Sequence, residues 1–183
     1  MTSPWGPLAG LIGEWVSDED GLDVSFHSDK GKVGETRYRE ETSFAPYGPV
    51  TVGGQTLYGL DYHTTTWRAG DEEPFHREVG YWMWDEANKQ VMRCFIVPHA
   101  TTLMAGGTVE ADATTFKLSS ALGSNTYGIL SNQYLDALAK TTSYDVTITI
   151  DGDTFSYDQT TVVAYQRHPT VILHTDRNTL RRR

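Results

Sequence analysis

The sequence has only one cysteine, Cys94, so no disulfide can form within the chain. Such usage is typical of a reducing compartment. The first residues, MTSPWGPLAG, have no basic leader, and no run of 18 apolar residues follows that would suit a membrane-spanning helix. The expectation is therefore a cytoplasmic protein with neither a signal peptide nor a membrane anchor.

Common motifs of metal and nucleophile chemistry are also missing. No His-x-His, His-Glu-x-x-His or Cys-x-x-Cys occurs, so a structural zinc site is not expected. No Gly-x-Ser-x-Gly occurs either, which removes the usual support for a Ser-His-Asp hydrolase. Glu40 and Glu41 are adjacent in a predicted strand and point to opposite faces, so they cannot work as a carboxylate pair.

Basic residues are few: 15 Lys and Arg stand against 24 Asp and Glu, a net charge of −9. An acidic body disfavours nucleic-acid binding, because neutralising phosphates supplies most of that affinity. The basic residues gather at the C-terminal end, 177–183, which finishes in three arginines. We expect this end to be a solvated, frayed terminus, with a nucleic-acid-binding arm as the minor alternative.

The chain is rich in aromatic residues, and apolar and polar residues alternate along many of its segments. Of its 183 residues 38% are hydrophobic and 11% aromatic, enough for the core of a single domain spanning 1–183. In Tyr144-Asp-Val-Thr-Ile-Thr-Ile150 apolar and polar residues alternate, which indicates a half-buried strand, and Asp151-Gly-Asp153 then predicts a hairpin turn. Similar runs predict further strands at Glu35–Phe44, Thr56–Thr66, Arg77–Trp84, Gln90–Val97, Thr114–Ser120, Thr154–Tyr157, Thr160–Tyr165 and Thr170–His174.

Two segments are predicted to be helical. Pro7–Ile12 is a short apolar stretch before the first strand, and Tyr127–Lys140 carries apolar residues on one helical face: Leu130, Tyr134, Leu135 and Leu138. Many short strands with few helices indicate an all-β fold with antiparallel strands. Composition alone leaves a sandwich and a barrel open.

Three motifs, in this order and spacing, resemble the nitrobindin family. They are Gly13-Glu-Trp-Val-Ser-Asp-Glu-Asp-Gly21, Tyr38-Arg-Glu-Glu-Thr-Ser-Phe-Ala-Pro-Tyr-Gly48 and Pro74-Phe-His-Arg-Glu-Val-Gly-Tyr-Trp82. The late hairpin around Asp151-Gly-Asp153 also matches, so the resemblance covers nearly the whole chain. It implies a single antiparallel up-and-down β-barrel of ten strands, similar in shape to fatty-acid-binding proteins, with a b-type haem in a solvent-open pocket. Tyr127–Lys140 is then an inserted helix.

The first motif departs from the family's pattern of glycines at alternate positions. Ser17 and Glu19 replace two of those glycines, while Gly13, Trp15 and Gly21 keep the pattern. Glycines at alternate strand positions leave bare backbone that a flat ligand can approach. The replacements therefore predict a narrower wall on the haem side, or a different bound molecule.

An iron ligand is expected among the late histidines, because the resemblance places it near the C-terminus and haem iron requires an axial imidazole. His174, in His-Thr-Asp-Arg-Asn-Thr-Leu, fits that context best, and Asp176 is its natural hydrogen-bond partner. His168 is the alternative, although Pro169 after it favours a turn. The other reading of His174 is a rim side chain bonded to Asp176 or to backbone.

The remaining pocket residues are assigned more loosely. By resemblance, His76 overhangs the open side of the haem, where it could hydrogen-bond a distal ligand without binding iron, and His99 lies in a turn near the pocket mouth. His27 and His63 are expected on the surface. If the strand face of Glu40 lines the pocket, that carboxylate needs an Arg or Tyr partner. Apolar residues that either line the cavity or belong to the plain core are Trp82, Trp84, Phe95, Val97, Leu103 and Met104.

Two functions follow from these expectations. The resemblance implies a haem protein that binds nitric oxide and isomerises peroxynitrite to nitrate. The alternative is a non-enzymatic carrier of a small hydrophobic or fatty-acid-like ligand, since barrels of this size can hold one small molecule. A third, weaker possibility is an interaction domain that uses an exposed barrel face, and the homodimer is an open option.

Overall fold

The computed structural model describes residues 3–27 and 30–183. Strands make up most of these described residues, which also contain one 3₁₀ helix and one α-helix. In chain order the elements are η1 (Gly6–Leu11), β1 (Gly13–His27), β2 (Lys32–Val52), β3 (Gln55–Arg68), β4 (His76–Asp85), β5 (Gln90–Ile96), β6 (Thr101–Thr108), β7 (Thr115–Ala121), β8 (Ile129–Ser131), α1 (Gln133–Leu138), β9 (Ala139–Asp151), β10 (Thr154–Tyr165) and β11 (Ile172–Arg182).

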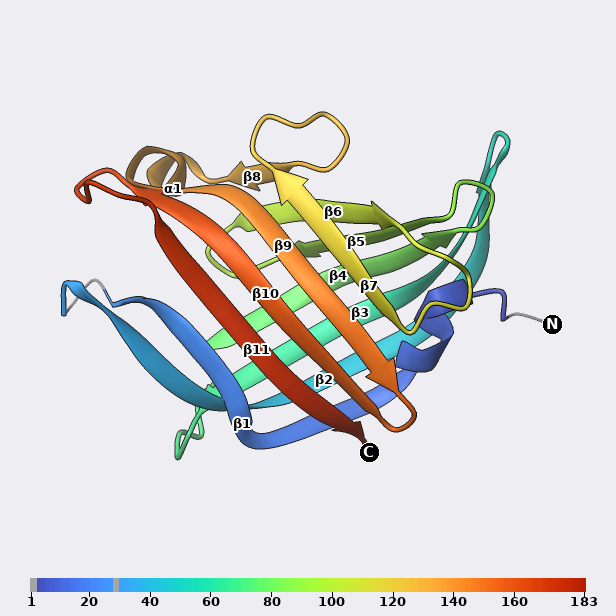
Figure 1. The fold of residues 1–183 in the computed structure, drawn as a ribbon, viewed down its shortest axis with the longest axis horizontal. Coiled ribbons are helices and arrows are strands. Elements are labelled where there is room, and N and C mark those ends of the chain that lie inside the picture. Colours follow the sequence, from blue (N-terminus) through green and yellow to red (C-terminus); the bar gives the residue numbers. More distant parts are fainter. Residues whose placement is uncertain (1–2, 28–29) are drawn as a thin grey trace.

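The strands form one antiparallel sheet that closes on itself (Figure 1). Its order is β5-β4-β3-β2-β1-β11-β10-β9-β7-β6-β8, and β5 also pairs with β6. That pairing joins the two ends of the sheet, so ten strands make a closed barrel and the short β8 is an addition beside β6. Closure removes the unpaired edges that an open sheet would expose. The barrel predicted by the family resemblance is confirmed, and the sandwich is excluded.

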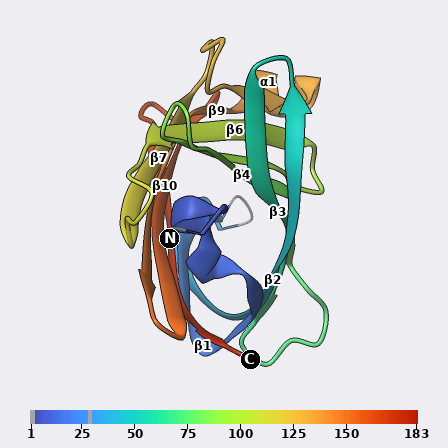
Figure 2. The ribbon, with the colours of Figure 1, turned by 90° about the vertical axis from the view of Figure 1, so that its right-hand side faces the viewer.

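Alternation along each strand builds the interior, as the pattern of β9 shows. Its residues Tyr144, Val146, Ile148 and Ile150 are all buried, and the residues between them face outward. η1 lies inside the ring of strands (Figure 2), where Leu8 and Leu11 are fully buried. The helix therefore fills one end of the lumen with apolar side chains, and the core gathers around it.

The inserted helix is shorter than the sequence pattern suggested. Only Gln133–Leu138 is α-helical, with the Asn132 side chain accepting a hydrogen bond from the Leu135 amide at 3.0 Å. Before it, Ile129–Ser131 pairs with β6 as a strand. Leu130 is 71% exposed and Tyr134 70% exposed, so the predicted apolar face does not form. Pairing with β6 outweighs the helical periodicity here.

The basic C-terminal end is a paired strand, so the expectation of a frayed terminus is wrong. β11 runs to Arg182 and hydrogen-bonds β1 on one side and β10 on the other. The Arg182 guanidinium lies 4.2 Å from the centre of the Trp15 ring and also contacts Asp153. The last strand is fixed because it is paired on both sides, with β10, which precedes it in the chain, and with β1 from the other end of the sequence.

Candidate functional site

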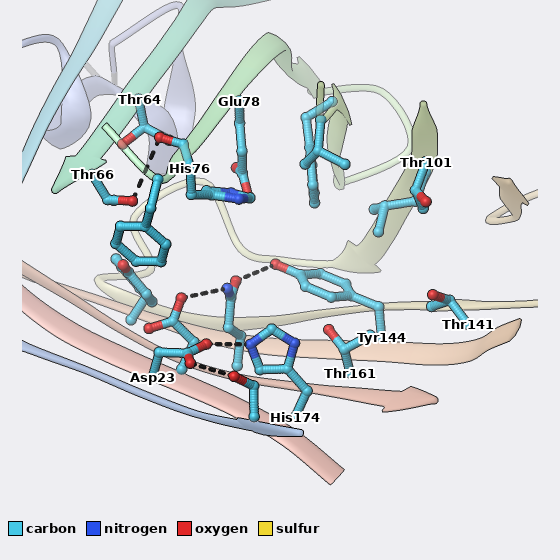
Figure 3. Close-up of a pocket in the computed structure, with 18 of the residues that line it drawn as sticks. Asp23, Thr64, Thr66, His76, Glu78, Thr101, Thr141, Tyr144, Thr161 and His174 are labelled. Carbon is cyan, nitrogen blue, oxygen red and sulfur yellow. Dashed lines mark hydrogen bonds and ion pairs between the residues drawn. The ribbon is translucent and has the colours of Figure 1, made fainter. Parts of the chain in front are cut away.

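A cavity of about 500 Å³ occupies the lumen, lined by the inward-facing residues of the strands (Figure 3). Both polar and aromatic side chains reach it. On β11 the period-two alternation turns His174 and Asp176 inward together, and on β1 it does the same for Asp23 and Ser25. The site therefore follows directly from the strand pattern once it is known which face is inside.

His174 lies in the cavity wall and is held by a carboxylate from the neighbouring strand. Its Nε2 lies 2.5 Å from Oδ2 of Asp23, and the Ser25 hydroxyl donates to the other oxygen of Asp23 at 2.6 Å. Burial alone would raise the pKa of Asp23, but the bonds from His174 and Ser25 bring it below its usual value. An imidazole fixed by a carboxylate at one nitrogen is the arrangement typical of histidines that bind a metal through the other.

Asp176, the hydrogen-bond partner predicted for His174 from the sequence, does not contact it; Asp23 takes that place. Asp176 instead accepts hydrogen bonds from the Tyr38 hydroxyl and, at 3.2 Å, from Gln159 Nε2. Burial, with the nearby charges of Glu40 and Asp23, raises the pKa of Asp176 to about 7 although the Tyr38 bond acts against it. Sequence reasoning missed Asp23 because it lies 151 residues from His174 and only strand pairing brings the two together.

His168, the alternative iron ligand, does not line the cavity. It lies in the turn between β10 and β11, where its Nδ1 is 2.9 Å from the Thr170 carbonyl oxygen, and its ring packs against Phe26. The turn that Pro169 predicts at this position is therefore present. Of the other histidines, His76 and His99 line the cavity and His63 is exposed. His27 also lines it, contrary to the surface expectation, because it continues the inward alternation of Asp23 and Ser25.

A second carboxylate–imidazole pair lies on β4. Glu78 Oε1 is 3.2 Å from His76 Nε2, and Glu78 Oε2 is 2.7 Å from Arg93 Nη2 and accepts a hydrogen bond from the Tyr62 hydroxyl at 2.8 Å. Burial would raise the pKa of Glu78, but Arg93, His76 and Tyr62 together lower it to about 2. Burial likewise opposes the charge on His76, and Glu78 outweighs it, so the pKa of His76 is raised.

Glu40 has the tyrosine partner that its position required. The Tyr157 hydroxyl donates to Glu40 Oε2 at 2.7 Å and lies 2.7 Å from the Tyr38 hydroxyl, which contacts Asp176. Tyr157 is partly buried, and burial with the nearby charge of Glu40 raises its pKa well above the usual value. The buried carboxyl group of Glu40 and the partly buried one of Asp176 are thus joined through two tyrosine hydroxyls.

Of the predicted apolar lining, Trp82, Phe95, Val97 and Leu103 border the cavity and two residues do not. Met104 follows Leu103 on β6 and therefore faces the other side of the sheet, so its assignment as a cofactor-binding residue has no support in the geometry. Trp84 faces inward but lies under η1, where it belongs to the core.

Ser17 and Glu19, which stand in β1 where the family pattern has glycines, do not narrow the cavity wall. Glu19 is exposed within the irregular stretch where the β1–β2 register shifts between Ser17 and Gly21. Ser17 is buried, accepts a hydrogen bond from the Glu40 amide at 3.1 Å and another from Asn178 at 2.8 Å, and does not border the cavity. The narrower haem-side wall expected from these replacements is therefore not seen.

Within residues 3–27 and 30–183, no cluster of three or more His, Cys, Asp or Glu side chains is placed to hold a bare metal ion. The same part of the chain contains no helix long and apolar enough to cross a membrane. Two of the cavity's imidazoles, His76 and His174, are each held by one carboxylate.

Comparison with known proteins agrees with this geometry. Residues 5–182 match the family described as the THAP4-like, heme-binding beta-barrel domain. The chain belongs to this family, the nitrobindins. A similar solved structure is that of Rv2717c from M. tuberculosis, which is 21% identical, with a TM-score of 0.67 over 100% of this chain and 99% of that one. This likeness shows the shared fold. No curated protein matches the sequence.

Proposed function

We propose that this nitrobindin-family barrel binds haem b in its cavity, with His174 as the axial ligand. The observation that carries the proposal is the His174 imidazole, which lines the cavity while Asp23 occupies its Nε2. A donor fixed by a carboxylate at one nitrogen suits iron bound at the other. Aromatic side chains at the cavity wall, Trp82 and Phe95 among them, offer apolar surface to a flat macrocycle.

The chain's own residues would divide the work between two walls. His174 on β11 would hold the iron, and Asp23 would keep the ring oriented. His76 on β4 lines the same cavity and is available to hydrogen-bond a small ligand. When bound, the haem would supply a Lewis-acidic iron, and we propose that this chemistry is the binding of nitric oxide and the isomerisation of peroxynitrite to nitrate.

The assignment of His174 as the axial ligand is tested by titrating the protein with haem and measuring the absorbance of the Soret band. Wild-type protein is expected to bind haem, and His174→Ala to weaken binding by more than about tenfold because the axial bond is lost. His168→Ala is the matched control, since that ring lies outside the cavity and should leave the titration unchanged. Unaltered haem binding in His174→Ala, or a loss in His168→Ala, would contradict the assignment.

The isomerase activity has its own test. Stopped-flow decay of peroxynitrite, with nitrate measured as product, should be accelerated by the haem-loaded protein and not by the haem-free protein. If the haem-loaded protein leaves the decay rate unchanged, the proposed isomerase activity is contradicted, while the proposal of haem binding is not affected.

One observation favours the carrier as a second candidate. Arg68 lines the cavity with its guanidinium 4.6 Å from the centre of the Phe75 ring, and within the described residues it forms no ion pair. Such a group suits the carboxylate of an amphipathic ligand. Native mass spectrometry of protein purified without added haem would reveal a retained lipid. The cytoplasmic location and the homodimer stay predictions.

A further inference from the structure

A buried ion pair spans the interior between β4 and β5. Arg93 and Glu78 are each only 5% exposed, and Arg93 Nη2 lies 2.7 Å from Glu78 Oε2. Aromatic rings from several strands surround the Arg93 guanidinium, whose Cζ lies 4.5 Å from the centre of Phe95 and 5.1 Å from that of Trp82. A buried ion pair adds little net stability compared with an apolar pair of the same volume. Its presence under a cavity therefore calls for a role beyond stability.

The pair is connected to the cavity through one side chain. Glu78 uses its second oxygen to hold Nε2 of His76 at 3.2 Å, and the His76 side chain is 34% exposed where it lines the cavity. With His76 protonated, one carboxylate is shared by two cations, so the cluster carries a net charge of +1. Within this cluster Glu78 and Arg93 are buried against each other, so the excess positive charge lies on the His76 ring, which faces the cavity.

We propose that Glu78 and Arg93 are positioning residues that hold His76 as an imidazolium, and that His76 thereby forms an anion-binding subsite in the cavity wall. The ligand class is a small oxyanion that accepts a hydrogen bond from the His76 ring. The inference deepens the proposed function, on which its substrate class rests, since peroxynitrite and nitrate are both such anions. The subsite itself consists of the chain's own residues and does not require haem.

Charged and titratable groups from several elements face His76. Burial lowers the pKa of His76, whereas Glu78, Asp176 on β11 and Glu40 on β2 raise it. The carboxylates outweigh burial, so the pKa is raised overall. Burial, and after it the positive charge of His76, lowers the pKa of His99, which precedes β6. Arg93 on β5 and Tyr62 on β3 reach His76 only through Glu78. Because the charged form binds the anion, affinity should be full at low pH and lost as the pH rises through the raised pKa of His76.

The test follows the His76 ring by NMR in haem-free protein labelled at histidine, with sodium nitrate as the probe. Nitrate is expected to shift the His76 signals and to leave those of His63, which is exposed on the outside of β3, unchanged. Glu78→Gln should weaken nitrate binding by about tenfold and move its pH range downward, because a charged hydrogen bond is lost. Glu78→Asp should restore part of both effects, which a purely structural role would not predict.

A second variant covers the case in which Glu78→Gln does not fold. His76→Gln changes a cavity-facing side chain and leaves Glu78 bonded to Arg93 and Tyr62. Because this variant lacks the His76 signals, nitrate binding is followed in it and in wild type through the ring signals of His99, which also lines the cavity, and nitrate should no longer shift them. If nitrate fails to shift His76 at any pH, or still binds His76→Gln as tightly, the subsite is overturned. The Soret titration of His174→Ala reports on haem binding independently, so the two proposals fail separately.

Discussion

Glu40 shows how a charged residue is tolerated in the lumen without a cation in contact with it among the described residues. Four side chains donate to its two oxygens, all between 2.7 and 2.8 Å: Thr42, Thr64, Tyr157 and Asn178. A buried carboxylate is costly unless its oxygens are hydrogen-bonded. Glu40 meets that condition by hydroxyl and amide donors, whereas Glu78 meets it by two cations and a tyrosine. The polar lumen is thus built from individually satisfied residues.

At the residue scale, the acid sensitivity of folding should depend on Glu78. Its pKa is about 2 in the folded protein, below the ordinary 4.5, so its contribution to stability is full above pH 4.5 and disappears as the pH falls toward 2. For this shift the loss is on the order of 3 kcal/mol in the free energy of unfolding. Urea unfolding at a series of pH values measures it.

Glu78→Gln should flatten that acid branch while lowering stability at neutral pH. Glu110→Gln, which removes one partner of the exposed Lys89–Glu110 ion pair, is the control and should keep the wild-type dependence. An acid branch in Glu78→Gln as steep as in wild type would show that other groups control it.

At the element scale, the β4–β5 hairpin shows why one glycine of the His-x-Glu-x-Gly motif is required. A Cβ placed at Gly80 would collide with the carbonyl group of Cys94 and with Cα of Phe95 on β5. Both obstacles are backbone, so only separation of the two strands could relieve the contact. The hairpin carries His76, Glu78 and Arg93, and its spacing therefore positions the site.

We predict that Gly80→Ala destabilises the fold by about 1 to 3 kcal/mol, the usual cost of overpacking. Gly54→Ala is the matched control, because a Cβ at Gly54, in the turn between β2 and β3, meets no atom within 4 Å. Thermal unfolding should show a clear fall in Tm for the first and almost none for the second. Equal Tm values for the two variants would contradict the packing argument.

At the scale of the whole molecule, barrel closure brings the two ends of the chain together. β11 lies between β1 and β10, and the Arg182 guanidinium donates to the carbonyl oxygens of Ile12 at 2.5 Å and Gly10 at 3.0 Å. Gly10 belongs to the last turn of η1 and Ile12 directly follows this helix, which fills one end of the lumen. The last strand therefore fastens the N-terminal helix as well as closing the sheet.

Arg182→Ala should cost about 1 to 2 kcal/mol of unfolding free energy, from the lost hydrogen bonds and the contact with Trp15. Arg183→Ala is the control, since that exposed side chain has only a 3.3 Å contact with Glu41 and should change stability little. Denaturant unfolding of both variants measures the difference. A neutral Arg182→Ala would mean that η1 is held by its apolar face alone.

Local patterns predicted most of the strands and several site residues. Alternation identified the buried residues of β9 from Tyr144 to Ile150, and the same rule applied to β1 would have placed His27 beside Asp23 and Ser25. The helical periodicity of Tyr127–Lys140 predicted too long a helix, because β8 pairs with β6 and no local sequence pattern indicates that pairing. Met104 was misplaced for lack of a known inside face.

The amino-acid sequence by itself determined the strand content and the barrel family, and it ranked His174, which lines the cavity, ahead of His168, which does not. Tertiary structure alone decided that Asp23 rather than Asp176 holds His174, that Arg93 neutralises Glu78, and that the arginine-rich end is a strand. The reason is physical: strand propensity and alternation are properties of neighbouring residues, whereas hydrogen-bond partners across a barrel depend on which distant strands pair and in what register.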